Sequence, residues 1–122
     1  MTKLPQALEA LRCFGWGKGH LKNPEDGTLC AMGALNMAEF LNAESHLLIQ
    51  EPATVPDAVA DMNALAKVVD EQYPDRVVDY GSRALCVAWT KIAGFNNHEY
   101  TTFADVEKVF EKAIAARHEE VD

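Results

Sequence analysis

The sequence predicts an all-α fold, a compact bundle of about five helices with room for a short β-hairpin near residues 16–30. Apolar residues recur at helical spacing in five stretches, and the connections between these stretches have ordinary lengths. The chain has 122 residues, of which 48% are hydrophobic and 25% charged, and these proportions suit one domain with a real core. We therefore expect a single helical domain over residues 1–122.

The first helix is expected over residues 3–14, with Thr2 as its cap and Gly15 at its end. Its apolar positions recur at steps of four and three: Leu4, Leu8 and Leu11. Residues 15–27 follow with four of the seven glycines and a Pro-Glu-Asp-Gly turn. This composition favours a loop or a short hairpin.

The central helix is expected over residues 29–41, capped by Thr28. It is apolar on nearly every side, which is typical of a helix that is buried all round. Gly33 stands among alanines and indicates a close contact with another helix. The segment 43–53, which contains Pro52, is expected to be the most flexible connection.

Three further helices are expected. The first begins near Thr54 and Asp57, whose spacing resembles a capping box, and Pro74 interrupts it. The second covers about 82–93 and stops at Gly94, and its apolar residues are Leu85, Cys86, Trp89 and Ile92. The last has Thr102 as cap and Asp105 three residues later, and its apolar face consists of Phe103, Val106, Val109, Phe110, Ala113 and Ile114.

The charge of the chain excludes some partners. Nineteen acidic and eleven basic side chains give a net charge of −8, and residues 44–79 hold eight acidic against two basic ones. Such a balance disfavours direct nucleic-acid binding and anionic membranes. No apolar stretch reaches membrane-spanning length, and no secretion signal is present, so we expect a cytoplasmic protein. The acidic segment is a solvated helix face, a surface that imitates nucleic acid or a surface that docks on a basic partner.

The cysteines and histidines offer one catalytic hypothesis. Cys30 falls in the first turn of the central helix, where a thiolate is stabilised, and His20 or His98 could act as its base. The orienting group would then be Asn96, Asn97 or Asp105. The alternative is that Cys30 is a small core residue, as we expect for Cys13 and Cys86. No histidine pair has metal-ligand spacing, so neither a metal nor another cofactor is expected.

The glycine-rich run 15–20 could cradle an anion, although it lacks the spacing of known phosphate loops. A nucleotide-like molecule could lie between this run, the start of the central helix and the turn 96–100. Its candidate ligand-binding residues are Trp16, Lys18, His20, Asn96 and Asn97. The alternative is a structural turn in which Trp16 covers the core.

Four short motifs carry a resemblance: Phe14-Gly15-Trp16, Leu29-Cys30-Ala31-Met32-Gly33-Ala34-Leu35, Phe95-Asn96-Asn97 and Thr102-x-x-Asp105-Val106. In this order they resemble a family of small uncharacterised actinobacterial and actinobacteriophage proteins, over roughly residues 12–116. The pattern of that family has histidine where this chain has Phe14, tryptophan at Leu29 and Phe95, and aspartate at Asn97. The resemblance implies a bacterial or bacteriophage origin and an unassigned function, and it transfers no catalytic residue. Loss of the histidine and the aspartate favours a packing role for the motifs.

Three functions remain open. The first is a nonenzymatic protein that binds a host protein or a second copy of itself, which predicts an exposed apolar or acidic patch and no deep polar cleft. The second is the small-ligand site described above, which predicts a pocket lined by Trp16, Lys18 and Asn97. The third is a hydrolase or transferase that uses Cys30, which requires an accessible thiol within reach of His20 or His98.

Overall fold

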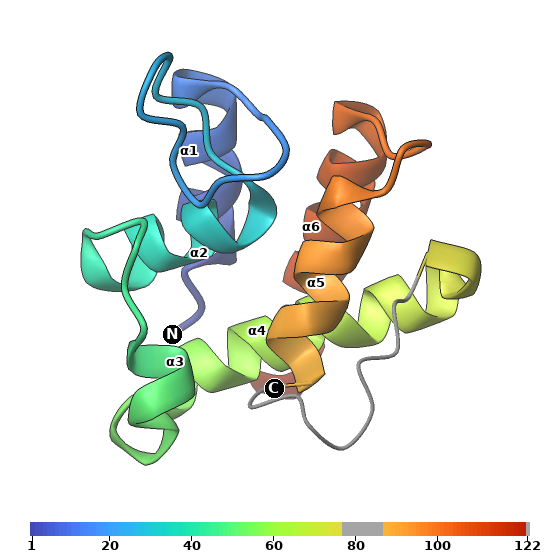
Figure 1. The fold of residues 1–122 in the computed structure, drawn as a ribbon. Coiled ribbons are helices and arrows are strands. Elements are labelled where there is room, and N and C mark those ends of the chain that lie inside the picture. Colours follow the sequence, from blue (N-terminus) through green and yellow to red (C-terminus); the bar gives the residue numbers. More distant parts are fainter. Residues whose placement is uncertain (77–86, 122) are drawn as a thin grey trace.

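In a computed structural model, the structure describes residues 1–76 and 87–121, and these contain six α-helices and two short 3-10 helices (Figure 1). The α-helices are α1 (Leu4–Phe14), α2 (Ala31–Phe40), α3 (Leu47–Gln50), α4 (Pro56–Gln72), α5 (Val87–Asn97) and α6 (Phe103–Val121). The 3-10 helices are η1 (Pro52–Thr54) and η2 (Pro74–Arg76). Within these residues no strand forms, and the prediction of an all-α fold is confirmed.

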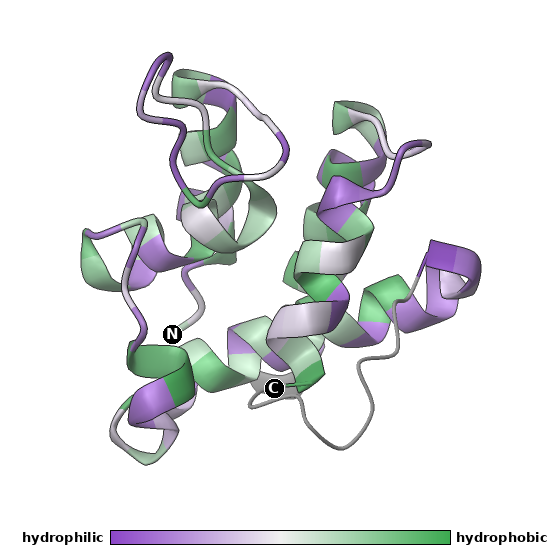
Figure 2. Cartoon of the chain, viewed as in Figure 1, coloured by the Kyte–Doolittle hydropathy of each residue, from purple (hydrophilic) through white to green (hydrophobic). Residues whose placement is uncertain are grey.

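The helices form two groups that share one core. Helix α1 packs on α2, α4 packs on both α5 and α6, and contacts of α1 with α6 and of α2 with α5 join the groups. Figure 1 shows α4 running crosswise to α5 and α6. The largest fully buried side chains come from both groups: Leu4, Leu11, Met32, Leu35, Leu65, Val69, Ile92, Phe95, Val106 and Phe110. Hydrophilic residues gather instead in the loop after α1 and beyond the end of α4 (Figure 2).

Helix α1 begins and ends close to where the sequence predicts, and α6 begins where it predicts. Lys3 is the N-cap of α1, whereas Thr2 accepts a hydrogen bond from the amide of Leu4 at 3.2 Å. Gly15 ends α1 with a φ of 90°. At the start of α6 the capping box is confirmed: the Thr102 amide donates to the Asp105 carboxylate at 3.1 Å, and the Asp105 amide donates to the Thr102 hydroxyl at 3.4 Å.

The suggested hairpin is not formed. Only two isolated bridges occur between residues 16 and 30, one of Trp16 with Leu29 and one of Lys22 with Leu29. Thr28 is also not the cap of α2, because its amide and hydroxyl both donate to Asp26 in a local turn. Cys30 takes that role, and its Sγ accepts a hydrogen bond from the Gly33 amide at 3.3 Å.

Two expectations about the middle of the chain need correction. A Cβ atom on Gly33 would lie 1.8 Å from the carbonyl oxygen of Leu21, so the close contact is with the loop backbone and not with another helix. The segment 43–53 is not an unstructured connection, since it forms α3 and part of η1. Leu48 of α3 is buried in the core, and this packing orders the segment.

The bounds of α4 and α5 also differ from prediction. No side chain caps α4, because the Thr54 hydroxyl donates to the carbonyl of Glu51 instead of forming a box with Asp57. Helix α5 continues through Gly94 to Asn97. Burial of Phe95 and Asn96 outweighs the cost of a glycine in a helix, about 1 kcal/mol.

Two of the three cysteines were expected in the core. Cys13 is instead exposed, on the side of α1 away from the buried leucines, and its thiol donates to Glu9 at 3.5 Å. Cys86 lies outside the described residues, as does Leu85. Cys30 is buried, in agreement with the structural alternative for that residue.

Candidate binding sites

The glycine-rich run and the end of α5, which are far apart in the sequence, meet at Asn96. The indole N–H of Trp16 and the amide of Ala31 both donate to Oδ1 of Asn96, at 2.7 and 2.9 Å. Its Nδ2 donates to the Gly17 carbonyl at 3.1 Å. Asn96 is fully buried. We call this cluster the Asn96 junction, since one amide connects the loop, the start of α2 and α5.

A second set of contacts extends the junction toward the surface. Oδ1 of Asn97 accepts hydrogen bonds from the Gly19 amide at 2.9 Å and from Nδ2 of Asn96 at 3.1 Å. Nζ of Lys18 donates to the carbonyl of His98 at 2.6 Å. The polar groups of Trp16, Lys18 and Asn96 that the sequence offered to a ligand are thus bonded to the protein itself. Their contacts hold two segments together.

The residues of the catalytic hypothesis do not form a reactive set. Cys30 is only 6% exposed, and burial raises the pKa of its thiol, although backbone amides of α2 act in the opposite direction. Nδ1 of His98 accepts a hydrogen bond from the Tyr100 amide at 3.2 Å. His20 does line the same pocket as Cys30. The accessible, activated thiol that the hypothesis requires is absent from this arrangement.

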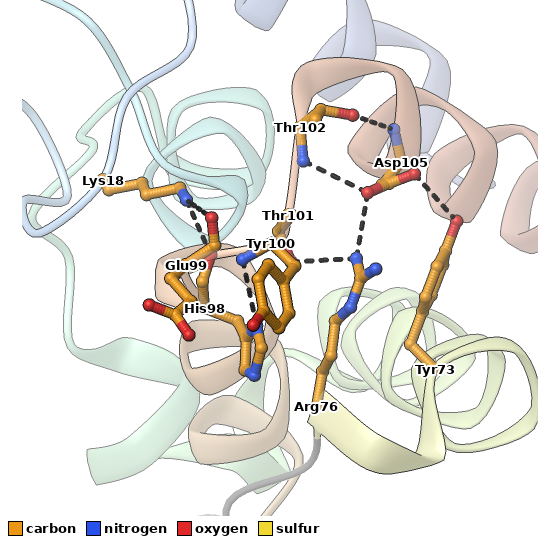
Figure 3. A network of polar contacts seen from close by, with 9 residues as sticks. All are labelled: Lys18, Tyr73, Arg76, His98, Glu99, Tyr100, Thr101, Thr102 and Asp105. Carbon is orange, nitrogen blue, oxygen red and sulfur yellow. Dashed lines mark hydrogen bonds and ion pairs between the residues drawn. The ribbon is translucent and has the colours of Figure 1, made fainter.

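Asp105 belongs to a polar network at the start of α6 (Figure 3). Arg76 donates to Asp105 at 2.9 Å and to the Thr101 hydroxyl at 3.2 Å, and the Tyr73 hydroxyl donates to Asp105 at 3.3 Å. Partial burial opposes ionisation of Asp105, but the hydrogen bonds from Arg76 and the Thr102 amide outweigh it and lower the pKa. Burial and the neighbouring carboxylate raise the pKa of Tyr73. Asp105 therefore orders the end of α4 against α6.

A buried acidic cluster was missed by the sequence analysis. Asp61 of α4 is fully buried, and it accepts hydrogen bonds from the Thr2 hydroxyl at 2.6 Å, the Lys3 amide at 2.9 Å and Nε of Arg117 at 2.9 Å. We call these residues, together with Glu39 of α2, the Asp61 cluster. The cluster ties the start of α1 and the helices α2, α4 and α6 to one another.

Glu39 completes the cluster as a carboxyl group whose pKa is raised. Its Oε1 is buried and accepts no hydrogen bond from any described residue. Burial, and then the hydrogen bond and charge of Asp61, raise the pKa of Glu39 to about 8. A carboxyl group that keeps its proton can donate to Asp61, and this bond satisfies both groups.

An exposed leucine marks a further surface. Leu41, at the end of α2, is 86% exposed and has a left-handed backbone with φ 57° and ψ 27°, the sole positive φ among the described residues other than glycine. Two hollows of about 300 Å³ each include residues of this helix end in their lining. The lining residues of the two hollows make up what we call the Leu41 surface: Lys22, Pro24, Met37, Leu41, Asn42, Ala43 and Glu44 on one side, and Glu39, Phe40, Thr54, Val55, Pro56, Asp57 and Ala58 on the other.

Comparison with known proteins gives one match. The pattern of a family of unknown function, DUF6197, matches residues 2–116. The chain belongs to this family. No curated protein and no solved structure matches it. Membership in DUF6197 agrees with the resemblance to an uncharacterised family, and it leaves the activity to be argued from the structure.

Two further kinds of feature, metal sites and membrane-spanning helices, bear on the function of this DUF6197 chain. Among residues 1–76 and 87–121, no three histidine, cysteine, aspartate or glutamate side chains are grouped so that they could hold a metal ion. In the same residues no helix is both long and apolar enough to cross a membrane. Besides a hollow of about 370 Å³ between α4 and α6, the described residues offer two candidate sites, the Leu41 surface and a pocket beside the Asn96 junction.

Proposed function

We propose that this DUF6197 protein acts by binding another protein at the Leu41 surface, without catalysing a reaction. The observation that carries the proposal is the state of Leu41, a large apolar side chain that is 86% exposed and held in a left-handed conformation. Exposure of leucine to water is unfavourable, and a left-handed backbone costs a residue with a Cβ about 1–2 kcal/mol. Glycine or asparagine is the usual residue at such a helix end.

A partner that covers Leu41 would account for its exposed position and its left-handed conformation. An exposed apolar side chain that lines one of two neighbouring hollows can insert into a partner, while side chains of the partner enter the hollows. Both hollows also contain apolar groups, Met37 in one and Phe40 in the other. The strain and the exposure at Leu41 are then compensated on binding.

The charge around Leu41 favours a basic partner. Glu44 lines one hollow as an exposed acid, Asp57 lines the other and pairs with the N-terminal ammonium group at 3.2 Å, and exposed Glu51 precedes η1. Lys22 is the basic residue of the lining. We therefore propose a cytoplasmic partner that presents an apolar side chain beside lysine or arginine. For a bacteriophage-encoded chain, as the resemblance implies, that partner is a protein of the host.

Crosslinking in living cells tests the proposal. A photoreactive phenylalanine analogue at position 41 is expected to link the protein to one partner with a basic contact region. The matched control carries the analogue at position 14, because Phe14 is also an exposed apolar residue, at 55%, and lies on α1 outside this surface. Equal crosslinking from the two positions contradicts the proposal. A link to a second copy of the chain would replace the proposed partner with self-association.

The substitution Leu41→Gly separates a binding role from a structural one. Glycine adopts a positive φ without strain, so the free energy of unfolding should stay the same or rise by up to about 1 kcal/mol. Capture of the crosslinked partner should be lost, while Phe14→Ala should retain it. Loss of stability in Leu41→Gly, measured by urea unfolding, would show that Leu41 supports the fold instead.

A further inference from the structure

A shallow pocket of about 180 Å³ lies where the loop after α1, the start of α2 and α5 meet. His20, Cys30, Trp89 and Asn97 are among its lining residues. The sequence indicated a small-ligand site between these segments, and His20 and Asn97 were among its expected residues. Trp16 and Lys18 do not line this pocket, because they take part in the contacts at the Asn96 junction.

The pocket contains hydrogen-bond donors that the fold leaves unused. Oδ1 of Asn97 already accepts from Gly19 and Asn96, but its Nδ2 donates to no group among the described residues. The indole N–H of Trp89 and the ring nitrogens of His20 likewise have no hydrogen-bond partner in the described part of the chain. The Asn97 amide and the Trp89 indole can donate to a ligand, and the His20 ring can donate through at least one of its nitrogens.

The remaining lining is apolar and includes one aromatic ring. Leu21, Met32 and Ala93 line the pocket beside half-buried Trp89. The Trp89 ring stacks with His46 at a centroid distance of 6.3 Å. A flat ring on the ligand could contact this indole while acceptors at its edge meet the free donors.

We propose that this pocket binds one planar ring compound with hydrogen-bond acceptors at its edge, of the class of nucleobases and aromatic carboxylates. Its volume of 180 Å³ is below the about 300–1,000 Å³ of sites for larger ligands, so a single ring system fits and a whole nucleotide does not. The site shares no lining residue with the Leu41 surface and does not depend on the proposed function.

Nuclear magnetic resonance of the full chain tests the site, with adenine and nicotinate as probes. Trp16 and Trp89 are the two tryptophans, so two indole N–H signals are expected, and Trp89→Phe assigns them. Binding should shift the Trp89 indole and the Asn97 side-chain amide saturably. The Trp16 indole, which is bonded to Asn96, should stay unchanged. A response to one probe identifies the acceptor type, and no saturable shift with either probe overturns the proposal.

The substitution Asn97→Asp tests whether Nδ2 of Asn97 donates to the ligand. Aspartate keeps an oxygen that accepts from Gly19 and replaces Nδ2 by an acceptor, so the fold should be retained while probe affinity falls about tenfold or more. The matched control is Asn63→Asp, at an exposed asparagine of α4 outside the pocket. Equal affinities of the two variants for the bound probe would contradict the assigned donor.

Discussion

The Asn96 junction and the Asp61 cluster both connect distant segments through a buried polar side chain, but one side chain is neutral and the other is charged. Each buries a polar side chain where segments distant in sequence meet, and both side chains are fully buried. Asn96 is neutral and uses both atoms of its amide, as acceptor for Trp16 and Ala31 and as donor to Gly17. Asp61 can only accept hydrogen bonds, and its negative charge is compensated by Arg117.

The comparison shows what charge adds to a buried contact. A satisfied amide needs no counterion and keeps its hydrogen bonds at any ordinary pH. A buried carboxylate requires an opposite charge, and a second carboxyl nearby requires a proton. The Asn96 junction should therefore be insensitive to pH, whereas the Asp61 cluster should respond both to pH and to loss of its arginine.

The largest effect is expected from Arg117→Met. Side chains of Arg117 and Asp61 are 10% and 0% exposed, so methionine leaves a buried carboxylate without its counterion, at a cost of about 3–5 kcal/mol. Urea unfolding measures this loss. The double variant Asp61→Asn/Arg117→Met should recover part of it, because the uncompensated charge is gone.

Arg12→Met is the matched control for that prediction. Arg12 bonds to Glu107 at 3.0 Å, but both side chains are partly exposed, so about 1 kcal/mol or less is expected. Similar losses in Arg12→Met and Arg117→Met would contradict the importance of burial at the Asp61 cluster.

Asn96→Ala tests the Asn96 junction, the uncharged one of the two sites. It leaves the Trp16 indole N–H and the Ala31 amide without their acceptor, which should lower the free energy of unfolding by about 2–4 kcal/mol. Asn97→Ala removes a bond to the exposed Gly19 amide, which water can replace, and should cost less. If Asn97→Ala is as destabilising as Asn96→Ala, burial of the amide does not explain the junction.

Local signals in the sequence predict much of the fold. The period of apolar residues locates α1 and α6, and Thr102 with Asp105 gives the correct start of α6. Contacts between distant residues explain the errors. Gly94 was expected to end a helix, but burial of Phe95 and Asn96 extends α5 by another turn.

The two buried polar sites differ in how far they could be foreseen. Asp61 lies in the acidic segment 44–79, which was expected to be a solvated face or a docking surface, although its spacing places it on the buried face of α4, with Ala58, Leu65 and Val68. That spacing could have indicated its burial, whereas its partner Arg117 lies 56 positions away and no local pattern connects them. Asn96 and Asn97 were singled out as ligand-binding residues of a turn, and their contacts with the loop after α1 join positions that no local pattern connects.

The most specific effect concerns the proton on Glu39. The pKa of this carboxyl is raised from 4.5 to about 8 in the folded protein, so between these values the folded chain holds a proton that the unfolded chain releases. The resulting stability is complete below about pH 4.5 and is lost as the pH rises through about 8. Asp61 and Asp57 favour the protonated form, whereas Lys3 opposes it.

Glu39→Gln should remove this pH dependence. Glutamine is neutral at every pH and can still donate to Asp61, so the urea midpoint of the variant should fall less than that of the original chain between about pH 5 and 8. The pKa values of Asp26 and Asp105 are lowered and those of Cys13, Cys30 and Tyr73 raised, so these groups titrate outside that window. The histidines are common to both proteins and cancel in the difference. If the urea midpoints of the two proteins change equally with pH, Glu39 is already ionised in the folded protein. The Asp61 cluster would then hold two negative charges instead of one.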